Sequence, residues 1–130
     1  MSFGGLVSAA AAAPNCGLTG KWKMTGNLDF ATVAAVMDCT INITSTGKYT
    51  GLCSSWTTGN PALPDEAVSG TIKANAQCKL SGVLTAPNVI ATTIRGGMVS
   101  NDGQLAVLVG SRGTDPNNPP QVRFLILMKQ

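Results

Sequence analysis

The sequence contains no histidine, and only 12 per cent of its 130 residues are charged. Without histidine the chain has no Ser-His-Asp or Cys-His nucleophilic centre, and it lacks the commonest metal ligand of proteins. The six acidic residues mostly fall at expected turns and loops, where capping and Asx turns account for them. We therefore expect a protein that is not an enzyme, with no catalytic residues, no metal site and no cofactor.

Clusters of one charge and long apolar runs are missing as well. The net charge of +3 comes from nine basic residues spread between Lys21 and Lys129, whereas nucleic-acid binding requires such residues to be clustered. No stretch reaches the roughly 18 apolar residues that a transmembrane helix needs. These absences argue against a nucleic-acid partner and against a transmembrane segment.

What the chain does contain is typical of a small all-β protein. Apolar residues make up 44 per cent, β-branched residues are frequent, and 15 glycines supply turn positions. The length of 130 residues suits a single domain. Four cysteines without a C-x-x-C pair indicate disulfides, and hence a secreted, periplasmic or extracellular surface location.

The stretch from Cys39 to Cys53 predicts a β-hairpin with a three-residue loop at 45–47, because β-branched and polar residues alternate on both sides of a glycine. If Thr44 pairs with Lys48, the two cysteines stand opposite each other on one face of the hairpin. Cysteines in that arrangement are close enough for a disulfide without any backbone movement. We therefore expect this bond to staple two neighbouring strands.

The first 15 residues contain a short apolar run and five consecutive alanines before Pro14. This pattern is typical of the end of a secretory signal peptide, although a positively charged beginning is missing. The alternative is an N-terminal arm that packs on the protein or on a neighbour. We assign 1–15 to this arm or signal remnant and 16–130 to one β-barrel domain, in which Cys16 and Cys78 either pair or remain buried thiols.

Eight stretches of alternating residues, separated by turn signals, predict eight strands in hairpin succession. They cover residues 18–25, 38–44, 48–54, 67–74, 77–85, 89–99, 104–112 and 121–129. An antiparallel meander of this size can close into a barrel, and a β-sandwich is the alternative.

Two stretches between the expected strands are ambiguous or irregular. Residues 27–36 either extend the neighbouring strands or form a short helix capped by Asp29, and we favour the strand. Glycine and two prolines predict a long loop over 56–66.

The alternation also predicts which side chains point into the barrel. Glycines at 20, 51, 70, 82 and 96 fall on the inward faces, where they relieve crowding. In the strand over 89–99, Ile94, Gly96 and Met98 are expected inside. A tight Asp102-Gly103 turn then sets Met98 opposite Val107. On this register the residues expected inside the next strand are Leu105, Val107 and Val109.

The last two strands are apolar on both faces. Because the outside of a barrel wall should be polar, a second apolar row indicates that something covers it. We expect a partner-binding surface formed by the outward row and by an aromatic residue in the long loop. Its residues are Trp56, Leu108, Leu125 and Leu127.

The segment from Gly17 to Trp22, with Gly-x-Trp at the start of the first strand, resembles the opening of lipocalin-like (calycin) barrels. The runs 39–53 and 98–103 also look like those of small secreted bacterial lipocalin-like domains. The resemblance implies an eight-stranded barrel, and an arginine of the last strand lying over the tryptophan. Arg123 matches that arginine.

We therefore expect a non-enzymatic secreted binding module that holds a small apolar ligand inside the barrel or a protein partner outside it. The residues expected to line the ligand cavity are Trp22, Ile41, Tyr49, Ile72, Leu80 and Met98. The alternative is a structural, self-assembling subunit, such as a homo-oligomer, an extracellular filament or a virion surface protein. It would use the N-terminal arm and the apolar last strands.

Overall fold

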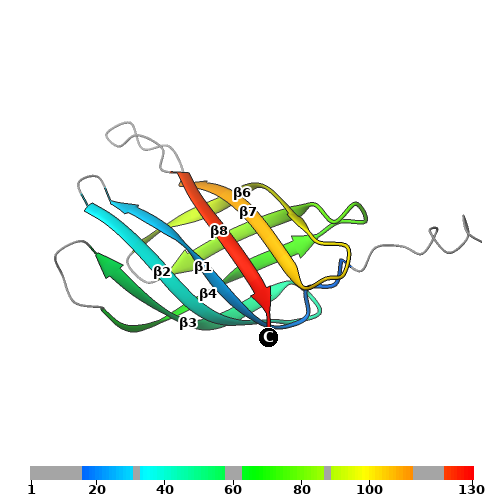
Figure 1. Cartoon of the computed structure of the whole chain (residues 1–130), viewed down its shortest axis with the longest axis horizontal. Helices are drawn as coiled ribbons and strands as arrows, with labels where there is room; N and C mark the ends of the chain where they lie inside the picture. Colours follow the sequence, from blue (N-terminus) through cyan, green and yellow to red (C-terminus); the bar gives the residue numbers. More distant parts are fainter. Residues whose placement is uncertain (1–15, 31–32, 58–62, 87–88, 113–121) are drawn as a thin grey trace, which may run out of the picture.

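Eight strands follow one another along the chain and close into one antiparallel barrel in the computed structural model (Figure 1). Each strand pairs with the next, and the last pairs with the first. The strands are β1 Gly20–Phe30, β2 Val33–Ile43, β3 Lys48–Thr57, β4 Leu63–Ala74, β5 Leu80–Ala86, β6 Val89–Val99, β7 Leu105–Arg112 and β8 Val122–Lys129. The predicted all-β meander barrel is confirmed, and the sandwich alternative is not.

The structure describes residues 16–30, 33–57, 63–86, 89–112 and 122–130. The segment expected as an N-terminal arm or signal remnant lies outside these residues. Residues 27–30 and 33–36 extend β1 and β2, with Asn27 paired to Val36, so the strand interpretation is confirmed over the helix. The predicted loop over 56–66 is too long, because β3 runs to Thr57 and β4 begins at Leu63.

The hairpin between β2 and β3 has the predicted register. The Thr44 N–H donates to the Lys48 carbonyl at 2.8 Å, and Gly47 takes a positive φ of 86° in the turn. Cys39 pairs with Cys53 across the strands and forms the expected disulfide, with their Cα atoms 4.0 Å apart. The disulfide therefore staples two strands that already share a hydrogen-bond ladder.

Cys16 and Cys78 form a second disulfide, which the sequence left open. It ties the segment before β1 to the turn before β5, and its two cysteines are 62 residues apart in the chain. The Val99 N–H donates to the Cys78 carbonyl at 3.0 Å, so the bridge also contacts the end of β6. This end of the barrel is closed by covalent and hydrogen bonds together.

The interior of the barrel holds a single cluster of apolar side chains. Inward rows from neighbouring strands meet there, because successive residues of a strand point to opposite faces. Trp22 is fully buried near the disulfide-tied end, and its indole N–H donates to the Leu18 carbonyl at 2.7 Å. The buried cluster also includes Met24, Met37, Cys39, Ile41, Ile43, Tyr49, Ile72, Cys78, Leu80, Leu84, Ile94, Val99, Ala106, Leu108, Leu125 and Leu127.

A β-bulge in β6 overturns the predicted inward row of that strand. Ile94 pairs with Gly110 and Gly96 pairs with Val109, so Arg95 is an extra residue on the β6 side. One extra residue shifts the alternation by one position and sends every later side chain to the opposite face. Met98 is therefore 56% exposed, whereas Val99 is buried. The expectation that Gly96 and Met98 point inward was wrong.

The same shift reverses the predicted faces of β7. The pairing of Met98 with Val107 is as expected, but it now belongs to the outer face. Leu105 and Val107 are exposed and Val109 is half-buried, whereas Ala106 and Leu108 are fully buried. The predicted register was right and the predicted inner row was wrong.

Candidate functional site

Five of the six side chains predicted to line a ligand cavity point into the barrel, but they pack against one another. Trp22 and Ile72 are 0% exposed, Ile41 is 1% exposed and Tyr49 is 2% exposed. The inner surface around these residues is therefore a packed core, and Met98 lies outside it.

Tyr49 shows how tightly this core is packed. Its ring lies over Gly70 of the neighbouring strand, where an added Cβ would come within 2.7 Å of the tyrosine Cε2. Burial raises the pKa of Tyr49 to about 12, although a hydrogen bond between its hydroxyl and the backbone of Thr85 acts in the opposite direction. The hydroxyl thus belongs to the wall of the barrel and is protonated at neutral pH.

The cation beside Trp22 is a lysine rather than the arginine that the calycin resemblance implied. Trp22 pairs with Lys129 across β1 and β8, and the lysine Nζ lies 5.8 Å from the ring centroid. Arg123 is six residues earlier on β8, which corresponds to about 20 Å along a strand, and it is buried beside Gly110. The expected place of Arg123 over the tryptophan was therefore wrong.

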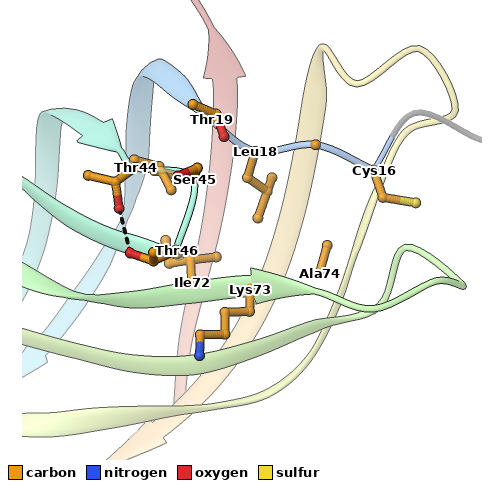
Figure 2. Close-up of a pocket in the computed structure, with 12 residues that line it drawn as sticks. Cys16, Leu18, Thr19, Thr44, Ser45, Thr46, Ile72, Lys73 and Ala74 are labelled. Carbon is orange, nitrogen blue, oxygen red and sulfur yellow. Dashed lines mark hydrogen bonds between the residues drawn. The ribbon is translucent and has the colours of Figure 1, made fainter.

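A cavity of about 370 Å³ opens at the disulfide-tied end of the barrel (Figure 2). The segment 16–19, the β2–β3 turn at 44–47 and the end of β4 at 72–74 form its walls. Leu18 points into the opening, and the Thr44 and Thr46 hydroxyls bond to each other across 3.0 Å. Ile72 is the one predicted ligand-contacting residue that borders this cavity.

A contiguous apolar surface lies on the outside of β7 and β8 and at the end of β6, and these three strands lie side by side in the barrel wall (Figure 1). Cross-strand pairs join its side chains, with Val107 opposite both Met98 and Ile126, and Leu105 opposite Met128. We call this surface the outer apolar face. Its exposed members are Met98, Leu105, Val107, Val122, Phe124, Ile126 and Met128.

A groove of about 330 Å³ indents one end of the outer apolar face. Met98, Leu105 and Val107 form its apolar wall, and residues 99–101 of the β6–β7 turn close it. Its concave shape lets a projecting apolar group be buried on several sides, as anchor residues are at protein interfaces.

The predicted partner-binding residues and the outer apolar face lie on opposite sides of the same wall. Leu108, Leu125 and Leu127 are 0% exposed and belong to the core. Trp56 pairs with Val36 through its backbone, and its side chain lies outside the described residues. Both rows of these strands are apolar, so the pattern alone did not say which row faces water.

One sequence signal pointed to the missed surface. Gly96 and Gly97 are adjacent inside a predicted strand, and glycine within a strand often marks a bulge. A bulge at this point exchanges the two rows of β7 and β8. Phe124, Ile126 and Met128 then become the exposed residues.

Charged side chains lie at two opposite ends of the outer apolar face. The Arg95 Nε donates to the Ser111 hydroxyl at 2.8 Å, near the end of β7. At the other end, the Asp102 Oδ1 accepts from the Ser100 hydroxyl and from the Gln104 N–H. These bonds hold the pKa of Asp102 below its usual value. Arg95 thus lies at one end of the face and Asp102 at the other, and the exposed Lys79 pairs with Met98 at the edge of the face next to β5.

In the part of the chain that the structure describes, no three His, Cys, Asp or Glu side chains are grouped as a metal site. No helix there is long and apolar enough to span a bilayer. No protein-family model and no curated protein matches the chain. The geometry described above therefore carries the functional argument.

Proposed function

We propose that this protein is a secreted, non-enzymatic binding module that recognises a protein partner through its outer apolar face. The observation that carries this proposal is the position of the large exposed apolar side chains. Among the ten that the described residues contain, seven lie together on β6–β8. Scattered exposed apolar residues are ordinary, but a contiguous patch on three strands is characteristic of an interaction site.

The eight-stranded barrel fits a lipocalin-like fold in general, and this resemblance supports a binding role. The interior around the expected cavity residues, however, offers little room for a ligand of the calycin type. The residues expected to line such a cavity are packed and almost inaccessible. An apolar ligand would have to displace core side chains, which costs free energy in a well-packed interior. A surface-binding function needs no such rearrangement.

Secretion is consistent with the two disulfides, because such bonds persist in oxidising compartments. The Cys39–Cys53 bond holds the β2–β3 hairpin, and the Cys16–Cys78 bond closes one end of the barrel beside the end of β6. We propose that the staples keep the scaffold rigid outside the cell while β6–β8 make the contact.

Site-specific photo-crosslinking tests this function. A photoreactive benzoylphenylalanine is placed at position 126, in the middle of the face, and in a matched control at position 52 on β3. Ile126 is 44% exposed and Leu52 is 52% exposed, so both positions are similarly accessible. The variants are illuminated in the extracellular fluid into which the protein is proposed to be secreted. We expect a discrete protein adduct at position 126 and none at position 52.

The masses of the adducts identify what binds. Equal adduct formation at both positions would indicate nonspecific collision, and no adduct at position 126 would refute a function of this face. The experiment requires the folded protein, which near-ultraviolet circular dichroism and intact disulfides confirm.

A further inference from the structure

We infer that the partner of the outer apolar face is a second copy of this chain, bound antiparallel to the first. This inference rests on the proposed binding role of the face and adds the identity of the partner. It follows from the arrangement of charge around the apolar rows, together with the spacing of those rows along β7 and β8.

Two identical faces that pack against each other are related by a two-fold axis lying between them. If the axis runs along the strands, each Asp102 lies at the same end as the second copy's Asp102, and Arg95 meets Arg95. If the axis runs across the strands, strand directions are reversed, and each Asp102 approaches the second copy's Arg95. Coulomb attraction favours the second arrangement.

The two charges are placed symmetrically about the middle of the face. Asp102 bonds to the N–H of Gln104, three residues before Val107, and Arg95 bonds to Ser111, four residues after it. A two-fold axis that crosses β7 at Val107 therefore brings each charge close to its opposite. No shift of register is needed to match them.

The apolar rows match about the same axis. Val107 pairs with Ile126, so the axis also crosses β8 near Ile126. Phe124 and Met128 stand two residues to either side of Ile126. Phe124 of one copy therefore faces Met128 of the second copy. Leu105 and Val109 are related in the same way on β7. The large apolar side chains at these positions of one copy therefore meet apolar side chains of the other.

The size of the face predicts a reversible dimer. Three strands about 4.8 Å apart, with outward residues over about 20 Å of strand, give a smaller contact than the roughly 800 Å² per partner of a standard interface. We therefore expect a weak, reversible dimer. Higher salt should weaken the dimer modestly, because the charge pairs lie at its rim.

Sedimentation equilibrium of the purified, disulfide-intact protein tests the inference, from low to several hundred micromolar. We expect a monomer–dimer equilibrium for the wild type, and at least a tenfold weaker dimer for Ile126→Lys, which buries a charge at the axis. The matched control Leu52→Lys, on the outside of β3, should leave the equilibrium unchanged. Circular dichroism shows whether each variant is folded.

A double-mutant cycle tests the antiparallel arrangement separately. Arg95→Glu places like charges together and should weaken the dimer several-fold, whereas Asp102→Asn keeps the Oδ1 acceptor of the turn and removes the charge. In the double variant the effect of Arg95→Glu should be smaller than in the single variant. Strict additivity would overturn the antiparallel arrangement.

A wild-type protein that remains monomeric at all concentrations would overturn the second-copy inference. If position 126 still crosslinks to a different protein, the proposed function stands with another partner. If it crosslinks to nothing, both proposals are refuted.

Discussion

The wall of this barrel has two unlike parts. On β1–β5 the outer row is mostly polar, with residues such as Lys21, Thr25, Thr40, Asn42 and Ser81 exposed. On β7 and β8 the exposed residues of the outer row are large and apolar, namely Leu105, Val107, Val122, Phe124, Ile126 and Met128. Both parts contribute apolar inner rows to the core, so the outer residues of β7 and β8 are not needed to form the barrel. Exposing these side chains to water costs free energy, which agrees with the proposed contact with another molecule.

Glycines of the two parts differ in the space around them, as Gly82 and Gly96 show. In β4 and β5, Gly70 and Gly82 have almost no space for a side chain, because backbone oxygens of neighbouring strands and the Tyr49 ring lie against them. In β6, nothing lies within 4 Å of a Cβ built on Gly96. Backbone atoms also lie against Gly97 of β6, so the open space is specific to Gly96 at the bulge.

Paired alanine substitutions on β8 give the largest expected contrast. Leu127→Ala should lower the free energy of unfolding by about 3 kcal/mol, because a fully buried side chain leaves a cavity. Its neighbour Ile126→Ala should change that free energy by about 0.5 kcal/mol or less, since Ile126 points outward. Denaturant unfolding at concentrations where the protein is monomeric measures both. Equal losses would show that the outer row supports the fold.

Glycine substitutions test the difference in space around Gly82 and Gly96. Gly82→Ala should cost about 2 to 3 kcal/mol, since Gly82 has a φ of +141° and an added Cβ meets the Thr71 carbonyl. Gly96→Ala should be nearly neutral, because its Cβ enters open space. Thermal unfolding of the two variants provides the comparison. A large loss for Gly96→Ala would contradict an open surface at the bulge.

Alkaline titration of Tyr49 gives the smallest expected effect. The folded pKa of about 12 exceeds the usual value of 10.0, so the folded state holds its proton more tightly than the unfolded state. The stabilisation is fully present below pH 10 and is lost as the pH rises from about 10 to 12, by about 2 kcal/mol. Lysines titrate in the same range, and Tyr49→Phe provides the control.

Because the chain has one tyrosine, phenolate absorbance reports this group alone. A spectroscopic pKa near 10 in the folded protein would show that Tyr49 is more exposed than its packing against Gly70 implies. A folded variant Tyr49→Phe should lack the corresponding part of the alkaline destabilisation.

Much of the fold followed from local pattern. The Gly47 turn and the alternation around it determined the register of β2 and β3, and this register brought Cys39 and Cys53 together. The Asp102-Gly103 turn likewise predicted the pairing of Met98 with Val107. Turn chemistry and period-two alternation act over a few residues, so they can be read from the chain itself.

The candidate site could not be read in the same way. Residues of both rows of β8 are large and apolar, and Arg123 and Lys129 share the inner row with Leu125 and Leu127. With two apolar rows the alternation did not decide which one faces the interior, and the row of Leu125 and Leu127 was expected to face a partner. In the barrel Lys129 lies against the Trp22 ring and Arg123 is buried, so the two cations sit near the ends of the inner row.

The sequence by itself determined the number and order of the strands, the hairpin registers and the first disulfide, because each depends on neighbouring residues. The tertiary structure decided which face of β7 and β8 meets water. A single extra residue at Arg95 shifts the alternation, and pairing across three strands then carries that shift to Phe124, Ile126 and Met128. The exposure of the outer apolar face thus depends on closure of the whole barrel. A row of side chains points inward or outward only once the closed sheet has an interior.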